Sequence, residues 1–487
     1  MGDRKVFSYH NFMFPFQWRI EGYEDKTFSE QINLRNIAYS HSSNWERSII
    51  PEELDEANDL YNERNYFYEF VHDALYDNGK TNTLIWHCER KEPQHGEVLY
   101  VIESGMHLYK LTVNSINLNL YSTGVGVLTF YLHNEKYQNP ADVLKINQVG
   151  RRVFPPYINS VEDRKLIAKS IEIIGLHGSE TGYREDFSGY TNKTQSNTPA
   201  SFIHNMILEA APNIILKPVI DDRMFVQCWY KNDEWTSAYI DNYQGFLSDS
   251  NWYEFVFVDD LGEPTCQNKE MRANLLKEAT YERWQDWGSL YGITRYSMVY
   301  LTNNSCPLYL TTYFETIYAR MAELILVQKA SVLRFSAEVT NISNMEEKKG
   351  FSEKVSSLYK EYIRFVNQIH FREISAQDQG IEMYKKLYDA MNLGEHVSKL
   401  DAEIEELYNY VSLSEDRKNN ATVSMLTEIA TIAVPMTVVA GLFGMNNRAF
   451  GEKNSFYNSL LFQLSTVLFI TIIVYLAIRK YKKGKSK

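Results

Sequence analysis

Apolar residues gather in two long runs near the end of the chain, whereas polar residues break up every apolar run before them. The first run covers roughly residues 425–445 and the second covers residues 456–478. A helix needs about 20 residues to cross a hydrocarbon layer of about 30 Å, and both runs reach that length. The pattern therefore predicts a large water-soluble region followed by two membrane-spanning helices.

Residues 1–280 contain short runs rich in Tyr, Phe and β-branched residues, separated by Gly, Asn and Pro. This composition is typical of β-strands, and clear examples are residues 96–102, 108–113, 126–132 and 224–229. Helical patterns intervene at residues 51–74 and 163–175, and the Ser-, Thr- and Gly-rich residues 178–199 predict a mobile loop. We expect these residues to form an α/β sheet domain.

Residues 281–420 change to long helical patterns, with apolar residues three and four positions apart over residues 310–340, 351–379 and 381–413. The last pattern has near-heptad spacing and leads almost directly into the first apolar run. We interpret it as a stalk that packs against other long helices. The alternative is a helical hairpin whose apolar side chains pack within the same chain. The predicted fold class is an α+β membrane protein with a sheet domain (1–280), a helical stalk region (281–420) and a two-helix membrane module (421–487).

The charge of the chain is unevenly distributed. The net charge is −12, yet six of the 50 Lys and Arg residues lie in the last nine positions, against 62 Asp and Glu residues overall. Duplex nucleic acid requires clustered Lys and Arg to neutralise its phosphates, so duplex binding is not expected. A small anionic ligand in one local basic pocket remains compatible with this composition. The four cysteines show neither metal-binding nor disulfide spacing, which fits a reducing compartment.

The basic residues also predict an orientation. The basic tail after residue 478 and the pair Arg417-Lys418 flank the two apolar runs. Both favour the cytoplasmic side of a membrane. Two crossings return the chain to its starting side, so we expect both termini in the cytoplasm and the protein in the inner (plasma) membrane.

Two membrane helices cannot enclose an aqueous path, so a pore would require several copies of the chain around one axis. The first apolar run has a face of small, hydroxylated or weakly apolar residues within about a third of a turn. This face comprises Asn420, Val423, Thr427, Ala430, Thr431, Val434, Thr437 and Gly441. Because small residues also permit close helix packing, an ordinary helix interface is the alternative interpretation.

Two further residues of the first run have distinct chemistry. Pro435 has no N–H to donate and can therefore bend the helix. Glu428 projects away from the threonine-bearing face, and we expect it near the cytoplasmic boundary, hydrated or paired, rather than as an ion ligand.

The sequence from about residue 351 to the C-terminus resembles the CorA magnesium-channel superfamily. The residues that carry this resemblance are Asn420, Leu426-Thr427, Ile429-Ala430-Thr431-Ile432, Pro435-Met436-Thr437, Ala440-Gly441 and Gly444-Met445-Asn446. The resemblance implies a homopentamer with a cytoplasmic funnel that conducts hydrated divalent cations. It also implies that Gly441, Thr437, Val434, Thr431, Thr427, Val423 and Asn420 line the pore in that order towards the cytoplasm.

By the same resemblance, Gly444-Met445-Asn446 is the selectivity motif, and Asn446 contacts the ion through its water shell at the external mouth. This role is chemically reasonable because Mg²⁺ loses its waters reluctantly. The chain departs from the family in the loop that follows, where the usual acidic motif is absent and Arg448 and Lys453 are present. Electrostatic concentration of divalent cations at the entrance is correspondingly weaker.

The N-terminal part is similar to the divergent CorA proteins encoded with type III CRISPR systems. The similarity rests on Gly124-Val125-Gly126-Val127-Leu128, Asp142-Val143-Leu144-Lys145-Ile146-Asn147 and Gly150-Arg151-Arg152-Val153-Phe154-Pro155. It implies a soluble domain that receives a nucleotide second messenger, either an S-adenosylmethionine–AMP conjugate or a cyclic oligoadenylate. Membrane disruption would then halt an infected cell.

Two residue pairs are candidates for the nucleotide site. Arg151-Arg152 could clamp a phosphate, because guanidinium groups bind phosphoryl oxygens in a bidentate manner. Asp221-Asp222 could accept from ribose hydroxyls or an amino group. Solvated strand ends with surface ion pairing are the alternative interpretation of both pairs.

Enzyme signatures are absent from the sequence. It contains neither a G-x-x-x-x-G-K-[ST] phosphate loop nor an H-E-x-x-H zinc helix, so we expect no catalytic activity. The sequence therefore favours a nucleotide-gated, CorA-like divalent-cation channel that acts as a defence effector. A housekeeping Mg²⁺ transporter and a membrane-disrupting receptor without selective conduction are the alternatives.

Overall fold

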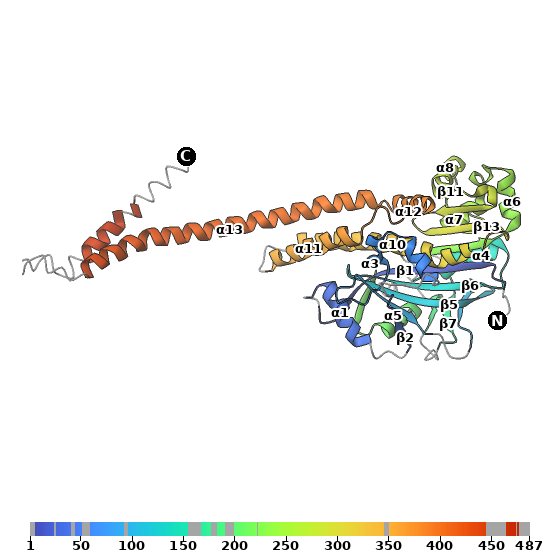
Figure 1. Ribbon diagram of the computed structural model, residues 1–487, viewed down its shortest axis with the longest axis horizontal. Helices are drawn as coiled ribbons and strands as arrows, with labels where there is room; N and C mark the ends of the chain where they lie inside the picture. The colour runs from blue at the N-terminus through green and yellow to red at the C-terminus, as the bar shows by residue number, and fades with distance from the viewer. Residues whose placement is uncertain are drawn as a thin grey trace, which may run out of the picture. The chain divides into compact units, whose positions relative to one another are not determined.

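The computed structural model describes residues 5–23, 26–39, 44–50, 59–91, 96–153, 167–176, 183–189, 199–221, 223–344, 350–444, 464–473 and 475–476. Contacts divide the chain into two compact units, Met1–Ile404 and Glu405–Lys487. Figure 1 labels the main helices and strands of the chain.

The first unit is built on one large sheet, to which thirteen strands among the described residues belong. The strands are β1 (Ser8–Ile20), β2 (Trp45–Arg47), β3 (Ile85–Arg90), β4 (Leu99–Ser104), β5 (His107–Tyr121), β6 (Val125–Asn134), β7 (Ser170–Ile174), β8 (Arg184–Asp186), β9 (Ile214–Pro218), β10 (Phe225–Lys231), β11 (Thr280–Tyr281), β12 (Ser289–Ile293) and β13 (Ser297–Thr302).

The main strand order is β11-β12-β13-β10-β1-β6-β5-β4-β7-β8, with β9 paired to β1 and β3 joining β2 to β5. Neighbouring strands run antiparallel except β10 and β13, which are parallel. The predicted strands in residues 96–102, 108–113, 126–132 and 224–229 are confirmed as parts of β4, β5, β6 and β10. The sheet is therefore mostly antiparallel, and the domain is of the α+β class rather than the α/β class with its largely parallel sheet.

The helices are α1 (Phe28–Tyr39), α2 (Asp59–Asn65), α3 (His72–Leu75), α4 (Pro140–Gly150), α5 (Ser201–Ala210), α6 (Asp233–Asp241), α7 (Ser250–Phe257), α8 (Lys269–Ala279), α9 (Tyr309–Tyr313), α10 (Ala319–Ser343), α11 (Phe351–Gln368), α12 (Asp378–Ala390) and α13 (Leu393–Gly444). A short π-helical segment, Phe314–Tyr318, joins α9 to α10.

Helices cover both faces of the sheet, as the alternation of side chains along β5 demonstrates. The even-numbered Leu118 and Leu120 belong to the hydrophobic core that also contains buried apolar residues of α4 and α5. The odd-numbered Asn119 and Tyr121 donate hydrogen bonds to Glu323 of α10 at 2.5 and 2.7 Å. Helix α10 therefore lies on the face opposite to α4 and α5, and Figure 1 shows α10 and α5 on the two sides of the sheet.

Three N-terminal predictions differ from the structure. Residues 163–175 were expected to be helical, but Ser170–Ile174 form strand β7, in which Ile171 and Ile173 are buried between β4 and β8. β-branched residues at alternate positions favour a strand. A loop was predicted at 178–199. Within it the structure describes only residues 183–189, which include strand β8, and residue 199. The predicted helix at 51–74 consists of α2, a 3₁₀ turn and the start of α3, with residues 51–58 outside the described residues.

The C-terminal helical predictions need two corrections. The pattern at 310–340 is confirmed, but α11 ends at Gln368, so residues 369–377 are not helical as expected. The pattern at 381–413 is divided between α12 and α13 by Met391 and Asn392. Asn392 has a φ of 52°, a left-handed conformation that ends a helix and that Asn tolerates better than most residues. The predicted single stalk helix is therefore two helices.

The sheet also extends beyond residue 281, where the helical region was expected to begin, because β12 and β13 follow that position. Helix α8 ends at Ala279, before these strands, and the first α-helix after residue 281 is α9, which begins at Tyr309.

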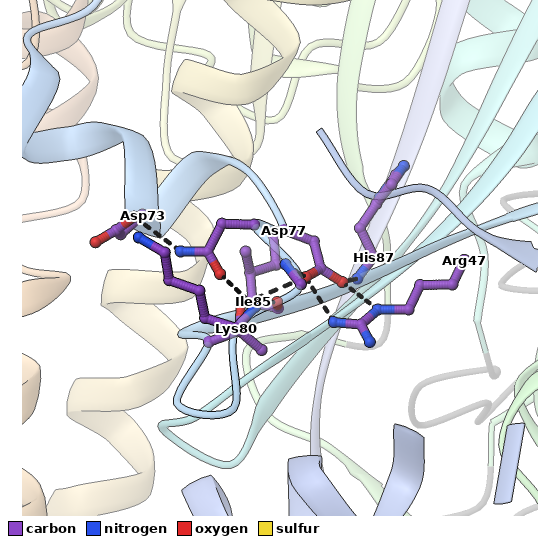
Figure 2. Close-up of polar contacts among 9 residues, drawn as sticks. Arg47, Asp73, Asp77, Lys80, Ile85 and His87 are labelled. Atoms are coloured by element: carbon purple, nitrogen blue, oxygen red, sulfur yellow. Dashed lines mark hydrogen bonds and ion pairs between the residues drawn. The ribbon is translucent and has the colours of Figure 1, made fainter. Parts of the chain in front are cut away.

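The buried carboxylate of Asp77 holds the turn that leads into strand β3. Asp77 accepts hydrogen bonds from Nε and Nη2 of Arg47, both at 2.7 Å, and from the backbone N–H groups of Gly79 and His87 at 2.9 and 3.2 Å. Figure 2 shows Arg47 and His87 approaching Asp77 from one side, with the turn through Lys80 on the other. The carboxylate thus joins β2, β3 and the turn between α3 and β3.

Candidate functional site

The second unit contains the predicted membrane segment, which is the C-terminal part of α13. Between Leu393 and Val438, an 18-residue window has a mean hydropathy of 1.4, and none of this window is buried. By length and composition it is the one candidate membrane span among the described residues. Within the predicted second span, Leu464–Ile473 form a shorter apolar helix, and most of the other residues of 456–478 lie outside the described residues.

The predicted pore-lining residues all lie on α13. Asn420, Val423, Thr427, Val434, Thr437 and Gly441 are exposed, and Thr431 is partly exposed. A continuous helix keeps residues three and four positions apart on one side. These residues therefore lie along one side of a continuous helix, as their spacing predicted.

The threonine hydroxyls on this face are oriented by the helix backbone. Thr427 donates to the carbonyl oxygen of Val423 at 2.7 Å, and Thr431 donates to that of Thr427 at 2.6 Å. Thr437 donates to the carbonyl oxygens of Ala433 and Val434. Because each hydroxyl has a single proton, these bonds leave the oxygen lone pairs as the groups available to a ligand.

Three other sequence predictions concern this segment. Pro435 lies inside α13 and has no N–H to donate to the carbonyl of Thr431. Glu428 is exposed on the same helix. Gly444 is the last residue of α13, whereas Met445 and Asn446 lie outside the described residues.

The first unit brings together two segments that the sequence singled out separately. An isolated bridge pairs Arg152 with Arg223, and the N–H of Met224 donates to the carbonyl of Arg151 at 2.7 Å. Asp221 forms an ion pair with Arg223 at 3.0 Å, and Asp222 lies outside the described residues. The Arg151-Arg152 pair and Asp221 are therefore close together although 70 residues separate them in the chain.

The arginine pair is buried and is therefore not the solvated strand end that was the alternative interpretation. Arg151 and Arg152 are 2% and 8% exposed. Nη2 of Arg151 donates to the carbonyl of Val258 at 3.0 Å, so part of its hydrogen-bonding capacity serves the fold. A Cβ at Gly150, the residue before them, would lie 2.7 Å from Cδ1 of Ile102, so a larger residue there would displace that side chain.

A cavity of about 470 Å³ lies beside Asp221 and Arg223. Its walls include the turn between β12 and β13, helix α10, and the junction between α12 and α13. The residues on these walls that carry charge or a polar ring are Arg295, Tyr296, Lys329 and His396. Sequence reasoning missed them because they are far apart in the chain and belong to no local motif.

Lys329 and His396 are close together in this cavity. Nζ of Lys329 lies 2.5 Å from Nδ1 of His396 and donates to the carbonyl of Met391 at 3.1 Å. Burial, followed by the charge of Arg295, lowers the pKa of Lys329. Burial, followed by the charge of Lys329, lowers the pKa of His396. Burial is the larger cause of both shifts, and neighbouring positive charge adds to it.

Within the part of the chain that the structure describes, no group of three or more His, Cys, Asp or Glu residues could hold a metal ion. The structure therefore offers two candidate sites: the threonine-bearing face on α13 and the basic cavity in the first unit.

Comparison with known proteins gives one match and one negative result. No curated protein matches the chain. The family model described as CorA-like Mg²⁺ transporter protein matches residues 304–480, which include α9 to α13 and both predicted membrane segments. Residues 304–480 are therefore similar to CorA-like Mg²⁺ transporter proteins, and the match covers the helical C-terminal part of the chain rather than the sheet.

Proposed function

We propose that the chain forms a divalent-cation channel in which several copies of α13 surround a common axis. The threonine-bearing face would line the aqueous path. By family resemblance the assembly is a homopentamer with two spans per subunit, and both termini lie on the cytoplasmic side. The proposal assigns no enzymatic activity to the chain.

One observation carries this proposal: the hydroxyls of Thr427, Thr431 and Thr437 donate into their own helix. Their oxygens consequently face outward as hydrogen-bond acceptors. The water molecules around a hydrated Mg²⁺ ion present donors outward, because the metal binds their oxygen atoms. Rings of acceptor oxygens therefore suit the passage of a hydrated divalent cation, which gives up its waters reluctantly.

The selectivity motif is proposed to be Gly444-Met445-Asn446, with the side chain of Asn446 bonding the ion's water shell at the external mouth. We expect Asn446→Ala to change ion selectivity in flux measurements while the oligomer stays assembled. Thr422→Ala is a suitable control, because Thr422 is also exposed on α13 but lies off the predicted face. Unchanged selectivity in Asn446→Ala would count against this assignment.

We further propose that a nucleotide second messenger, either the S-adenosylmethionine–AMP conjugate or a cyclic oligoadenylate, binds the soluble region and controls the channel. The role would be that of a membrane effector in type III CRISPR antiviral defence. The proximity of Arg152 to Arg223 and Asp221 supports this proposal, because guanidinium and carboxylate groups can together bind phosphate and sugar groups. Coupling requires the ligand to bind one state of the channel better than the other.

The direct test is divalent-cation flux into proteoliposomes that contain the full-length protein, with and without each nucleotide. The proposal predicts a flux that depends on one of them. The Arg152→Ala variant should weaken nucleotide binding while the assembly persists. A wild-type protein that conducts divalent cations but binds none of the nucleotides would contradict the gating proposal alone.

A housekeeping Mg²⁺ transporter is the second candidate, and the description of the matching family as Mg²⁺ transporters favours it. This function predicts that the chain restores growth of a transport-deficient cell at low Mg²⁺ without any nucleotide. A membrane-disrupting receptor, the third possibility from the sequence, predicts leakage of solutes without ion selectivity.

A further inference from the structure

The cavity beside Asp221 is placed where a ligand could influence α13. Its walls come from the β9–β10 connection, the β12–β13 turn, α10, and the α12–α13 junction. All of these residues belong to the first unit. Its volume of about 470 Å³ is within the range of about 300–1,000 Å³ that is usual for small-molecule sites. The cavity is large enough for a nucleotide-sized group.

The charge of the walls favours an anion. Among the described residues that line the cavity, Arg223, Arg295 and Lys329 contribute cationic groups and Asp221 contributes a carboxylate. Asp221 is paired with Arg223, and no carboxylate in the described part of the chain forms an ion pair with Arg295 or Lys329. Within the described residues, Arg295 and Lys329 thus share a partly enclosed space without forming an ion pair.

An aromatic ring orients the arginines. The guanidinium carbons of Arg223 and Arg295 lie 5.5 and 4.8 Å from the ring centroid of Tyr296. Cation–π contacts at these distances are favourable and restrict the rotation of both side chains. Ordered guanidinium groups lose less entropy when they bind a phosphoryl group. Burial, followed by the charge of Arg295, lowers the pKa of Lys329, and an anion between the two cations would offset their repulsion.

Lys329 connects this cavity to the beginning of α13. Its ammonium group contacts the carbonyl of Met391 and Nδ1 of His396, which lie on either side of Asn392. Asn392 has the left-handed conformation that separates α12 from α13. Lys329 therefore fastens the junction between these two helices to α10.

We propose that this cavity binds the phosphoryl group of a nucleotide through Arg295 and Lys329, and that binding loosens the contact between Lys329 and the start of α13. The inference rests on the proposed nucleotide gating and assigns a site and a coupling residue to it. Lys329 has one ammonium group to share between the ligand and the junction. A ligand that attracts this group changes the restraint on the helix that continues into the CorA-like membrane segment.

The binding part is tested by calorimetry on the detergent-solubilised full-length protein. The probes are the S-adenosylmethionine–AMP conjugate, cyclic hexa-adenylate, AMP and inorganic phosphate. We expect Arg295→Ala to weaken the binding of whichever nucleotide the wild type binds by about tenfold or more, as for the loss of a charge-assisted hydrogen bond. Arg184→Ala is the matched control, because Arg184 is an exposed arginine of β8 outside the cavity, and its affinity should stay within about twofold of wild type.

The coupling part is tested by flux through Lys329→Gln channels at saturating nucleotide. The measured quantity is the ratio of flux with ligand to flux without it. This ratio should fall towards one in the variant, whereas a purely structural role for Lys329 would change both fluxes equally and leave the ratio unaltered.

The outcomes separate the two proposals. If the wild type binds none of the nucleotides, the gating proposal fails and this site fails with it. If the wild type binds a nucleotide and Arg295→Ala binds it equally well, only the assignment of this cavity is wrong. An unaltered flux ratio in Lys329→Gln would overturn the coupling role.

Discussion

The anchoring of α10 to the sheet through Glu323 leads to a quantitative prediction. This carboxylate is buried, and one of its oxygens accepts hydrogen bonds from Nδ2 of Asn119 at 2.5 Å and from the hydroxyl of Tyr121 at 2.7 Å. Glu323→Leu would leave both buried donors without this acceptor. Each such donor costs about 1–3 kcal/mol, and removal of a costly buried carboxylate offsets part of the loss. We expect a decrease of about 2–4 kcal/mol in the free energy of unfolding.

The Glu323→Gln variant separates hydrogen bonding from charge. Its amide oxygen can accept both hydrogen bonds, so its stability at pH 5 should lie within about 1 kcal/mol of wild type. Burial raises the pKa of Glu323, although its hydrogen bond from Tyr121 and the charge of Arg320 oppose the shift. A carboxyl whose pKa is raised by folding contributes stability below its unfolded-state value of about 4.3. That contribution is lost as the pH rises through the folded-state pKa.

The assay is urea unfolding of the detergent-solubilised protein at several pH values, followed by the fluorescence of buried tryptophans such as Trp86 and Trp229. The difference in unfolding free energy, wild type minus Glu323→Gln, should become more negative as the pH rises above about 4.3. Glu395→Gln is the control, because Glu395 is exposed and solvent screens its pair with Lys399. A difference that stays constant or grows more positive with pH would refute the argument that burial disfavours the Glu323 carboxylate.

Three other substitutions test the fold and the pore. Trp229→Ala should lower the free energy of unfolding by about 3–5 kcal/mol, because its fully buried ring packs on Tyr300 in the sheet core; a loss below 1 kcal/mol in urea titrations would contradict this packing. Asp77→Ala should cost about 3 kcal/mol, because it removes the bidentate partner of Arg47, and an unchanged urea midpoint would be inconsistent with that pair. Thr431→Val retains the side-chain volume but removes the acceptor oxygen, so Mg²⁺ uptake into proteoliposomes should fall by about tenfold without dissociation of the oligomer. Uptake equal to wild type would argue against the hydroxyl's role.

The sequence predicted the parts of the fold that have a local pattern. The strands in β4, β5, β6 and β10 follow from alternating and β-branched residues, and α10 follows from apolar residues three and four apart. The apolar segment of α13 is visible from hydropathy alone. These features are encoded by neighbouring residues, and they agree with the structure.

The parts that the sequence did not predict depend on contacts between distant residues. Ser170–Ile174 form a strand because β4 and β8 pair on either side of them. The division of the stalk at Asn392 depends on one left-handed residue within an otherwise helical pattern. The same reasoning applies to the site: the threonine-bearing face was predictable from periodicity, whereas the cavity joins Arg295, Lys329 and His396 from three separate segments.

The central claim is that the threonine-bearing face of α13 lines a water-filled path for divalent cations. The most direct measurement is Mg²⁺ flux through Val434→Cys and Ile432→Cys channels before and after a positively charged, water-soluble thiol reagent, with wild type as the control for the native cysteines. Val434 lies at the centre of the face and Ile432 lies on the opposite side of the helix. We predict that the reagent blocks flux through Val434→Cys and leaves Ile432→Cys and wild type unchanged. Block of Ile432→Cys with an unaffected Val434→Cys would contradict the claim.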